Sequence, residues 1–542
     1  MKNGENSNQF SRRKFVKSIA FAGIMAQIPI VLHSCKNVIA EIFLKLTGTN
    51  HILGHRLWLK NFPKPTEVIE IPILIIGSGI TGLSAARQLV KKDKTNFLLL
   101  ELENNIGGNS SFGTNKSTSF PHGAHYLPLP NLHDKELISF LHESKIITHF
   151  ENEMPIFDET QMCFKPQERL FIKNNWQEEL IPKYGNSESV NQEINRFFEI
   201  TSQLKEEKGF DGLFHFDIPI KKISKDTKYR DLDEITMKNW LTDNKFTSEE
   251  LFEYVNYCCK DDFGIGVEFV SAWAGLFYFC SRKHNASTTE NVLTWPEGNG
   301  RLATHLSKYV QNKTKNNQLV YEVKQNKDIV EVFCFNAKTN TSAIYKCEKV
   351  ICCAPQYINK YLFKERKISD KFQYAPWFTA TISLKKESQL NNSELYWDNV
   401  IYKSKGLGYI YNQHQTVNQI IENKSITYYF SFSDSNLKKA RKKFLSMNEK
   451  EIEKLIIFDL SIAHPTIKEE IETIEIYKIG HGMISPTPNF IFSKEKELAT
   501  QNIDNKIFFA HSDLSGISVF EEAFHQGINV VNQIFNESTL DT

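Results

Sequence analysis

The chain has 542 residues, of which 41% are hydrophobic, and this is enough to bury a large core and form two or more domains. Charged residues make up 24% of the sequence and the formal net charge is +1. No basic stretch with interleaved aromatic residues occurs, which excludes a dedicated nucleic-acid-binding protein. The nine cysteines lack the spacing of a zinc site or of a disulfide framework, so we expect free thiols and no metal.

The first 35 residues are expected to be a targeting signal that does not belong to the fold. Residues 11–17 read Ser-Arg-Arg-Lys-Phe-Val-Lys and match the bacterial twin-arginine signature nearly position by position. The uncharged stretch 18–32 follows, and its roughly 15 residues are fewer than the ~20 that a membrane-spanning helix needs. We therefore expect the twin-arginine export machinery as a partner and a periplasmic location.

The end of this signal leaves two interpretations open. Leu32-His33-Ser34-Cys35 resembles a loose lipobox, whose cysteine becomes the lipidated N-terminus after cleavage. The atypical His33 favours the alternative, in which cleavage occurs elsewhere and Cys35 has no special role. Lipoprotein modification would supply the two or more acyl chains that stable membrane anchoring requires. Residues 36–67 are expected to be a linker.

Residues 73–108 carry the most informative pattern. The apolar run Ile73–Ile76 leads into a G-x-G-x-x-G turn and a helical pattern. In such a turn the first glycine allows the tight bend, the second lets backbone approach a pyrophosphate, and the third lets helix and strand pack closely. A second apolar run ends about 20 residues later in Glu101, where a ribose-binding carboxylate belongs. The predicted dinucleotide-binding residues are Gly77, Ser78, Gly79, Ile80, Thr81, Gly82 and Glu101.

The middle of the chain predicts a second domain. Residues 131–290 look largely helical, beginning with a helix after an N-cap-like Asn131. One of these helices ends in Asp261-Asp262, a pair that is either solvated or placed to hold a cationic substrate. Further along the chain, β-rich segments predict the sheet of a substrate domain. They are residues 378–384, 408–411, 426–433 and 473–479.

Three segments together resemble the FAD enzymes of the flavin-containing amine oxidoreductase and phytoene-desaturase superfamily. Glu101 followed by Gly107-Gly108 is similar to the family's E-x-x-x-x-x-G-G segment. The loop at 295–302, with the helix and β-meander after it, is similar to the family's second glycine-containing element. The C-terminal strand at 506–510, followed by His511-Ser512-Asp513 and a helix, resembles the family's flavin motif.

The resemblance implies FAD as cofactor and an α/β fold. The Rossmann-like FAD-binding domain would be discontinuous, and an α+β substrate domain would lie over the flavin. The FAD-binding domain would comprise residues 68–130, 291–370 and 476–542, and the substrate domain residues 131–290 and 371–475.

The family motifs also imply individual contacts to the cofactor. Gly107, Gly108 and Gly300 would let backbone pass close to it, the backbone of Val320 would clamp the adenine, and Asp513 would reach the ribityl chain. Asn109 and Ile517 adjoin these motifs. The cofactor-binding set implied by the resemblance is Gly107, Gly108, Asn109, Gly300, Val320, Asp513 and Ile517.

Three further residues are implied to lie near the flavin as catalytic candidates. His125 and Tyr126 follow the glycine pair at the place where family members run their chain past the ring, and Met483 lies in a loop similar to one before the C-terminal motif. A structural role is the alternative for His125. Many amine oxidases of the family place a lysine near flavin N5, but the comparable strand here, residues 377–383, has none.

These patterns lead to three expectations about function. The first is an exported FAD-dependent oxidoreductase that removes a hydride from a small amine, with polyamines among the candidates. The second is an FAD-dependent desaturase or isomerase of a lipid-like substrate, which the absent lysine favours. The third is a non-catalytic periplasmic flavoprotein, because every firm motif binds cofactor and none breaks a bond.

Overall fold

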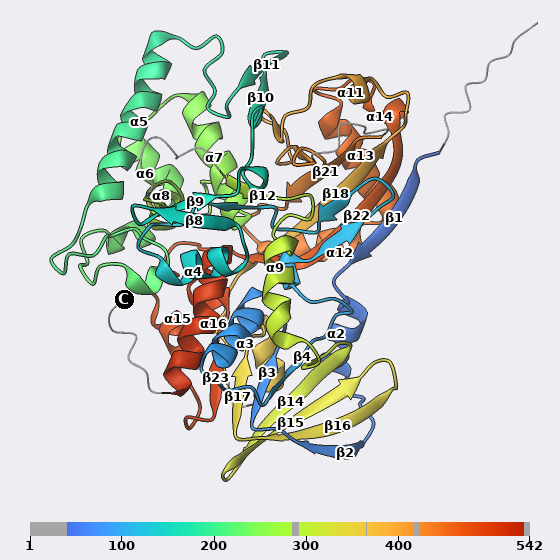
Figure 1. The fold of residues 1–542 in the computed structure, drawn as a ribbon. Coiled ribbons are helices and arrows are strands. Elements are labelled where there is room, and N and C mark those ends of the chain that lie inside the picture. Colours follow the sequence, from blue (N-terminus) through green and yellow to red (C-terminus); the bar gives the residue numbers. More distant parts are fainter. Residues whose placement is uncertain (1–40, 284–291, 365, 417–422, 536–542) are drawn as a thin grey trace, which may run out of the picture. The chain divides into compact units, whose positions relative to one another are not determined.

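The computed structural model describes residues 41–283, 292–364, 366–416 and 423–535 (Figure 1). The twin-arginine motif, the apolar stretch 18–32 and Cys35 lie outside these ranges. The chain from Ile42 onward packs as one unit. None of the described helices is long and apolar enough to cross a lipid bilayer.

A five-stranded sheet forms the Rossmann-like part of the molecule, with all neighbouring strands parallel. Its order is β13 (Thr314–Lys315), β4 (Phe97–Leu100), β3 (Ile73–Ile76), β17 (Lys349–Cys352), β23 (Ile507–Phe509). Every residue of β3 is buried, as expected for a central parallel strand covered on both faces. The strands come from all three predicted segments of the discontinuous domain, so the α/β fold class is confirmed.

Two helices that are far apart in the sequence pack together against this sheet. They are α3 (Ile80–Lys91) and α16 (Phe520–Ile534), both labelled in Figure 1. A Cβ atom on Gly527 would lie 2.3 Å from the carbonyl oxygen of Thr81. The glycine therefore makes the close approach of the C-terminal helix to the first Rossmann helix possible.

The predicted β-meander is present as part of a four-stranded sheet. Its order is β14 (Gln318–Asn326), β15 (Ile329–Asn336), β16 (Thr341–Cys347), β2 (Pro65–Glu70). The first three strands are antiparallel, and β2 pairs with β16 in parallel.

An eight-stranded sheet belongs to the substrate-binding part. Its order is β1 (Phe43–Gly48), β22 (Ile471–Ile484), β18 (Tyr374–Leu384), β21 (Ser425–Ser431), β20 (Tyr409–Tyr411), β19 (Asp398–Ile401), β10 (Glu168–Ile172), β11 (Asn175–Glu178). The four predicted strands of this sheet are confirmed as β18, β20, β21 and β22.

Two of the expected boundaries differ from the structure. Residues 36–67 are not a plain linker: they contain β1, α2 (His51–Leu59) and the start of β2, because β1 pairs in parallel with β22 and α2 buries Leu53 and Leu57. A domain boundary at 476 would cut through β22, whose Ile474 and Ile476 both face one buried core.

Residues 131–290 combine helices with strands. Asp134, not Asn131, caps the first helix, because its side chain accepts a hydrogen bond from the backbone N–H of Leu137. The helices are α4 (Lys135–Glu143), α5 (Glu188–Glu206), α6 (Met237–Asp243), α7 (Glu249–Phe263) and α8 (Ala272–Cys280). The strands are β8 (Ile147–Glu151) and β9 (Met154–Phe157), followed by β10 and β11, which extend the large sheet.

The remaining elements are short strands and further helices, some of which, such as α12, pack against the large sheet. The strands are β5 (Phe112–Thr114), β6 (Ser119–Pro121), β7 (Tyr126–Pro128) and β12 (Val292–Thr294). The helices are α9 (Gly300–Ser307), α10 (Gln356–Leu362), α11 (Gln389–Asn392), α12 (Leu437–Ser446), α13 (Glu449–Leu460), α14 (Ile467–Glu470) and α15 (Lys494–Ala499).

Candidate functional site

The first glycine turn forms an open cradle at the start of α3. Gly77 has φ +98°, a left-handed conformation that favours glycine, and its N–H donates to the carbonyl oxygen of Leu100 at 2.8 Å. A Cβ on Gly79 would meet no atom within 4 Å, whereas one on Gly82 would lie 2.0 Å from the Gly77 carbonyl oxygen. Gly79 thus faces free space beside the positive end of the helix, and Gly82 gives the close helix–strand contact. This geometry suits a pyrophosphate.

Glu101 lies at the end of β4 beside this cradle. One of its carboxylate oxygens accepts hydrogen bonds from the backbone N–H and the hydroxyl of Ser78, at 2.7 and 2.5 Å. The other oxygen accepts the N–H of Glu103 at 2.8 Å. These bonds fix the carboxylate but leave acceptor capacity for a ribose hydroxyl. The N–H of Gln318 donates to the Glu101 carbonyl at 2.7 Å, which brings β14, with buried Val320, to the same edge.

The glycine pair forms a second turn that touches the first. Gly107 has φ +110° and donates its N–H to the Ser78 carbonyl at 2.9 Å. Gly108 has φ +58°, and a Cβ there would lie 3.2 Å from the Gly79 Cα. The side chain of Asn109 donates to the carbonyl of Gly482 on β22 at 2.6 Å. The cradle, the glycine pair and the substrate sheet therefore meet at one place.

The C-terminal motif places Asp513 just after β23, beside the segment that follows β17. Its carboxylate accepts a hydrogen bond from the Tyr374 hydroxyl at 2.5 Å and one from the Gln356 N–H at 2.8 Å. Burial alone would disfavour the ionised form, but His511 and these donors lower the pKa of Asp513. The side-chain amide of Gln356 is fully buried with no protein partner at either polar atom. An unsatisfied buried amide beside the carboxylate fits a site completed by a polar ligand.

The other cofactor predictions occupy less direct positions. Ile80 and Thr81 are buried in the first turn of α3, and Ile517 is fully buried after Gly516, which has φ +88°. Gly300 begins α9, but a Cβ there would lie 2.5 Å from the ring of Phe112. Its lack of a side chain therefore makes room for an aromatic ring of the protein itself.

His125 and Tyr126 lie in a cluster of aromatic rings. The His125 ring centroid is 4.6 Å from that of Tyr429, 4.9 Å from that of Tyr126 and 5.7 Å from that of Trp397. Burial lowers the pKa of His125 to about 3, so its imidazole is neutral at physiological pH. Met483 lies on β22, where it pairs with Ala375 of β18. The ring contacts show that His125 and Tyr126 belong to one aromatic cluster.

Buried carboxylates stand next to these rings. The Tyr126 hydroxyl donates to Asp261 at 3.2 Å, and the Tyr257 hydroxyl donates to Asp398 at 3.4 Å. Burial raises the pKa of Asp261 to about 6 and that of Asp398 well above its usual value. Burial also raises the pKa of Asp262 to about 7, and one of its oxygens has no hydrogen-bond partner.

Within the part of the chain that the structure describes, Arg282 is the strong cation that acts on Asp261 and Asp262. Arg282 forms a 3.3 Å ion pair with Glu521 and favours ionisation of Asp262 through space. Since Arg282 already has Glu521 as a partner, the three aspartates are incompletely neutralised. Such a group of acids next to aromatic faces is suited to a cationic ligand.

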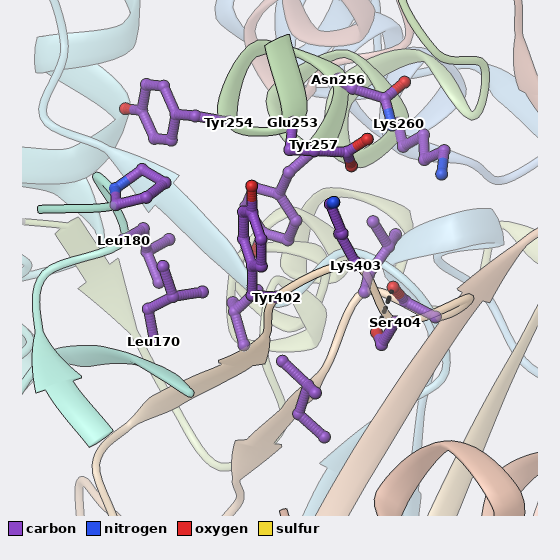
Figure 2. Close-up of a pocket in the computed structure, with 15 residues that line it drawn as sticks. Leu170, Leu180, Glu253, Tyr254, Asn256, Tyr257, Lys260, Tyr402, Lys403 and Ser404 are labelled. Atoms are coloured by element: carbon purple, nitrogen blue, oxygen red, sulfur yellow. Dashed lines mark hydrogen bonds between the residues drawn. The ribbon is translucent and has the colours of Figure 1, made fainter. Parts of the chain in front are cut away.

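A small cavity of about 40 Å³, partly open to solvent, adjoins this cluster (Figure 2). Tyr257 lines the cavity, so the residue that donates to Asp398 also faces this space. The lining includes two further tyrosines and several aliphatic side chains, with Glu253, Lys260 and Lys403 among the charged groups. The aromatic and aliphatic residues are Tyr254, Tyr257, Tyr402, Leu170, Leu180, Val400, Ile401 and Leu407.

Sequence reasoning identified one half of this cluster and missed the other. His125 and Tyr126 were candidates, and Asp261-Asp262 was one of two open interpretations. Trp397, Asp398, Tyr429 and Arg282 were missed, because no short motif marks them. The pairing of β19 with β10 and β20, and of β20 with β21, brings the first three into place. The eight described cysteines are free and buried, as expected. Among the described residues, no group of three or more His, Cys, Asp or Glu side chains is placed to hold a metal ion.

Comparisons with known proteins agree with this fold. The sequence profile of an NAD(P)-binding Rossmann-like domain matches residues 75–143. A sequence comparison with curated proteins gives no match.

Solved structures with the same fold cover nearly the whole chain. A triple mutant of putrescine oxidase has a TM-score of 0.64 at 14% identity, with 87% of this chain and 100% of the other covered. Cyclohexylamine oxidase from Brevibacterium oxydans has a TM-score of 0.60 at 12% identity, covering 86% and 99%. A fatty acid isomerase from P. acnes that produces CLA has a TM-score of 0.59 at 13% identity, covering 86% and 99%. The chain therefore has a Rossmann-type dinucleotide-binding unit within a fold shared by these oxidases and the isomerase.

Proposed function

We propose that the protein is an FAD-dependent oxidoreductase that removes a hydride from the carbon next to an amine nitrogen. The observation that carries this proposal is the cluster of His125, Tyr126, Trp397 and Tyr429 beside the buried Asp261 and Asp398. Aromatic faces attract cations, and buried carboxylates with little compensation favour a positively charged partner. Two oxidases among the structural neighbours, putrescine oxidase and cyclohexylamine oxidase, are named for amines.

FAD fits the cofactor half of the site. The cradle at Gly79 would hold the pyrophosphate, Glu101 the adenosine ribose, and Asp513 with the unsatisfied Gln356 amide the ribityl side. When bound, FAD supplies the acceptor for the hydride. We expect purified protein to be yellow and to release FAD, not NAD, on denaturation.

The protein's own groups would bind, orient and deprotonate the amine. The aspartates would draw the ammonium form into the cluster, and the rings would hold its carbon skeleton. Because its pKa is raised to about 6, Asp261 can accept the ammonium proton near neutral pH, leaving the nitrogen lone pair that supports hydride loss. Neutral His125 would orient the amine by accepting a hydrogen bond.

The test is anaerobic titration of the yellow protein with putrescine and with cyclohexylamine, followed by flavin absorbance. Bleaching by an amine, followed by peroxide release in air, supports the proposal. A flavoprotein whose flavin no amine reduces would contradict the proposal. If lipids also gave no reaction, the non-catalytic interpretation would remain.

A lipid-like substrate is the second candidate. The cavity in Figure 2 is lined largely by aliphatic and aromatic side chains, which also suit a hydrocarbon chain, and the isomerase shares the fold. Linoleic acid is the discriminating probe. A change in its double-bond positions, with no net flavin bleaching, would favour this candidate over amine oxidation.

We also propose that the protein is exported by the twin-arginine route to the periplasm and that Cys35 carries a lipid anchor. The support is the sequence at residues 11–17 and the lipobox-like residues 32–35. Replacing Arg12 and Arg13 by lysine should leave uncleaved protein in the cytoplasm, because lysine lacks the planar guanidinium of arginine. Cys35→Ala should leave export intact but abolish incorporation of labelled fatty acid. Normal export of the double lysine variant would refute the route.

A further inference from the structure

Exposed hydrophobic side chains are concentrated where the described chain begins. Of the 17 large hydrophobic side chains exposed among the described residues, six lie between residues 43 and 68. Three of them belong to α2: Ile52 at 75% exposed, Trp58 at 57% and Leu59 at 69%. Ile52 and Leu59 are seven residues apart and therefore share one helix face. A helix that buries only Leu53 and Leu57 thus presents apolar side chains to the outside.

Helix α12 is strongly basic. It contains five Lys or Arg residues and no acid, and Lys438, Lys439, Lys442 and Lys443 are all exposed. Lys438 pairs with Asp370, but within the described residues no ion pair neutralises the other three lysines. Leu445, in the same helix, is 41% exposed. The chain as a whole is nearly neutral, at +1, so this helix is a local concentration of positive charge.

Hydrogen bonds place α12 next to the start of α2. Lys478 on β22 donates its ammonium to the carbonyl of Met447, just after α12. The carbonyl of the same Lys478 accepts the N–H of Thr49, two residues before α2 begins.

A third helix, α10, adjoins both. The rings of Trp58 on α2 and Tyr361 on α10 are 6.4 Å apart. Lys360, the residue before Tyr361, is exposed. Charges on His55, Lys360 and Arg441 all reach His481 and add to the burial that lowers its pKa to about 3. The Tyr357 ring of α10 stacks on His481 at 3.8 Å, and a Cβ on the preceding Gly480 would lie 3.4 Å from Leu445 of α12. Helices α2, α10 and α12 therefore lie next to one another.

We propose that this surface, defined by Ile52, Trp58, Leu59, Lys360, Lys442 and Lys443 and called here the basic–apolar face, rests on an anionic lipid bilayer. Apolar and aromatic side chains insert at the boundary between headgroups and acyl chains, while lysines pair with anionic headgroups. The sequence supports this occupant, because the apolar residues 18–32 end 11 residues before Phe43 and Cys35 lies 8 residues before it. The proposal is independent of the reaction catalysed.

The experiment follows contact of this face with lipid, not simple co-sedimentation, because the N-terminal segment could bind vesicles by itself. Full-length protein carrying Leu59→Cys is labelled with an environment-sensitive fluorophore. The eight described native cysteines are buried, and Cys35→Ala removes the one outside the described residues. The matched control is Phe210→Cys, a position 80% exposed in the loop after α5. Vesicles of phosphatidylcholine with and without phosphatidylglycerol are the probe.

With anionic vesicles, and only with these, we expect the emission of the fluorophore at position 59 to shift to the blue and to be quenched by spin-labelled lipid. The fluorophore at position 210 should show neither change. Lys442→Gln with Lys443→Gln should weaken this response about 25-fold, five-fold for each lysine. The control pair is Lys327→Gln with Lys338→Gln, at two exposed positions in the β14–β15 and β15–β16 turns. This pair should not weaken the response at position 59. Unchanged circular dichroism shows that each variant folds.

Three results would overturn the proposal. They are co-sedimentation without a response at position 59, an equal response at positions 59 and 210, and a response that survives neutralisation of Lys442 and Lys443. Co-sedimentation without a response at position 59 would mean that the N-terminal segment alone binds the membrane. It would also fit a basic–apolar face that is covered by the N-terminal segment or by a second copy of the protein.

Discussion

The cofactor half and the substrate half of the site are built in different ways. In the cofactor half, Gly77, Gly79, Glu101 and Gly108 lie within one stretch of 32 residues and touch each other through backbone geometry. In the substrate half, Tyr126, Asp261, Asp398 and Tyr429 come from distant parts of the chain. Local sequence therefore determines the pyrophosphate and ribose part of the cofactor half, whereas tertiary packing determines the substrate half and brings in Asp513. Substitutions in the cofactor half should therefore weaken FAD binding, whereas substitutions in the substrate half should slow flavin reduction.

The largest effect is expected from Gly108→Val. A valine at φ +58° is strained, and its Cβ would lie 3.2 Å from the Gly79 Cα, in the turn that faces the cofactor. FAD affinity should fall more than about 100-fold, which equals about 2.7 kcal/mol, and the protein should be isolated colourless. Gly54→Val in α2, where a Cβ meets no atom within 4 Å, is the matched control and should stay yellow. A yellow Gly108→Val protein would show that the glycine pair is not at the cofactor.

The next largest effect is expected from Asp261→Asn. An amide cannot take the ammonium proton, so flavin reduction by an amine should slow by about 10²–10⁴-fold while FAD stays bound. Because burial raises the pKa of Asp261 to about 6, the wild-type reduction rate should rise with pH through that value, and the variant should lose this rise. Stopped-flow absorbance at several pH values measures both. An unchanged rate would remove Asp261 from the proton path.

His125→Ala should have a smaller effect on reduction. An imidazole whose pKa burial lowers to about 3 is a weak base, so its loss should remove one neutral hydrogen bond, worth about 0.5–1.5 kcal/mol or roughly 2–13-fold in rate. The control is His414→Ala, a buried histidine that stacks on Phe164 outside the cluster. A loss of 10³-fold or more for His125→Ala would assign proton transfer to this histidine instead of Asp261.

A separate effect, on stability and not on catalysis, is a change in the free energy of unfolding with pH. Burial raises the pKa of Asp262 from 3.8 to about 7, so between these values the folded state holds a proton that the unfolded state has lost. The free energy of unfolding must therefore fall as pH rises towards 7, by about 2–3 kcal/mol between pH 5 and pH 8 for this group. In the Asp262→Asn variant the free energy of unfolding should fall less between pH 5 and pH 8, because the contribution of this carboxyl is gone. Denaturant unfolding at both pH values checks this, and parallel curves for the two proteins would contradict it.

The same division explains what the sequence could predict. Strands β3 and β4 could be predicted residue by residue. Their apolar runs are bounded by glycines, which allow a tight turn, and by an acid, which can bind a ribose. The three-segment α/β fold followed from the same motifs. Trp397 and Asp398 could not be found, because their place depends on the pairing of β19 with β10, which are more than 200 residues apart. The role of Gly300 at the cofactor stays a prediction, because a glycine in a loop does not reveal which neighbour it admits, and a Cβ there would meet the Phe112 ring.

The pairing of β1 with β22 has a consequence for how the chain matures. Phe43 lies beside Thr473 and Gly48 beside Lys478, so the first described strand has its only partner near the other end of the polypeptide. During synthesis β1 must wait until more than 400 further residues have left the ribosome. Strand β1 thus takes its place in the sheet only when the polypeptide is nearly complete.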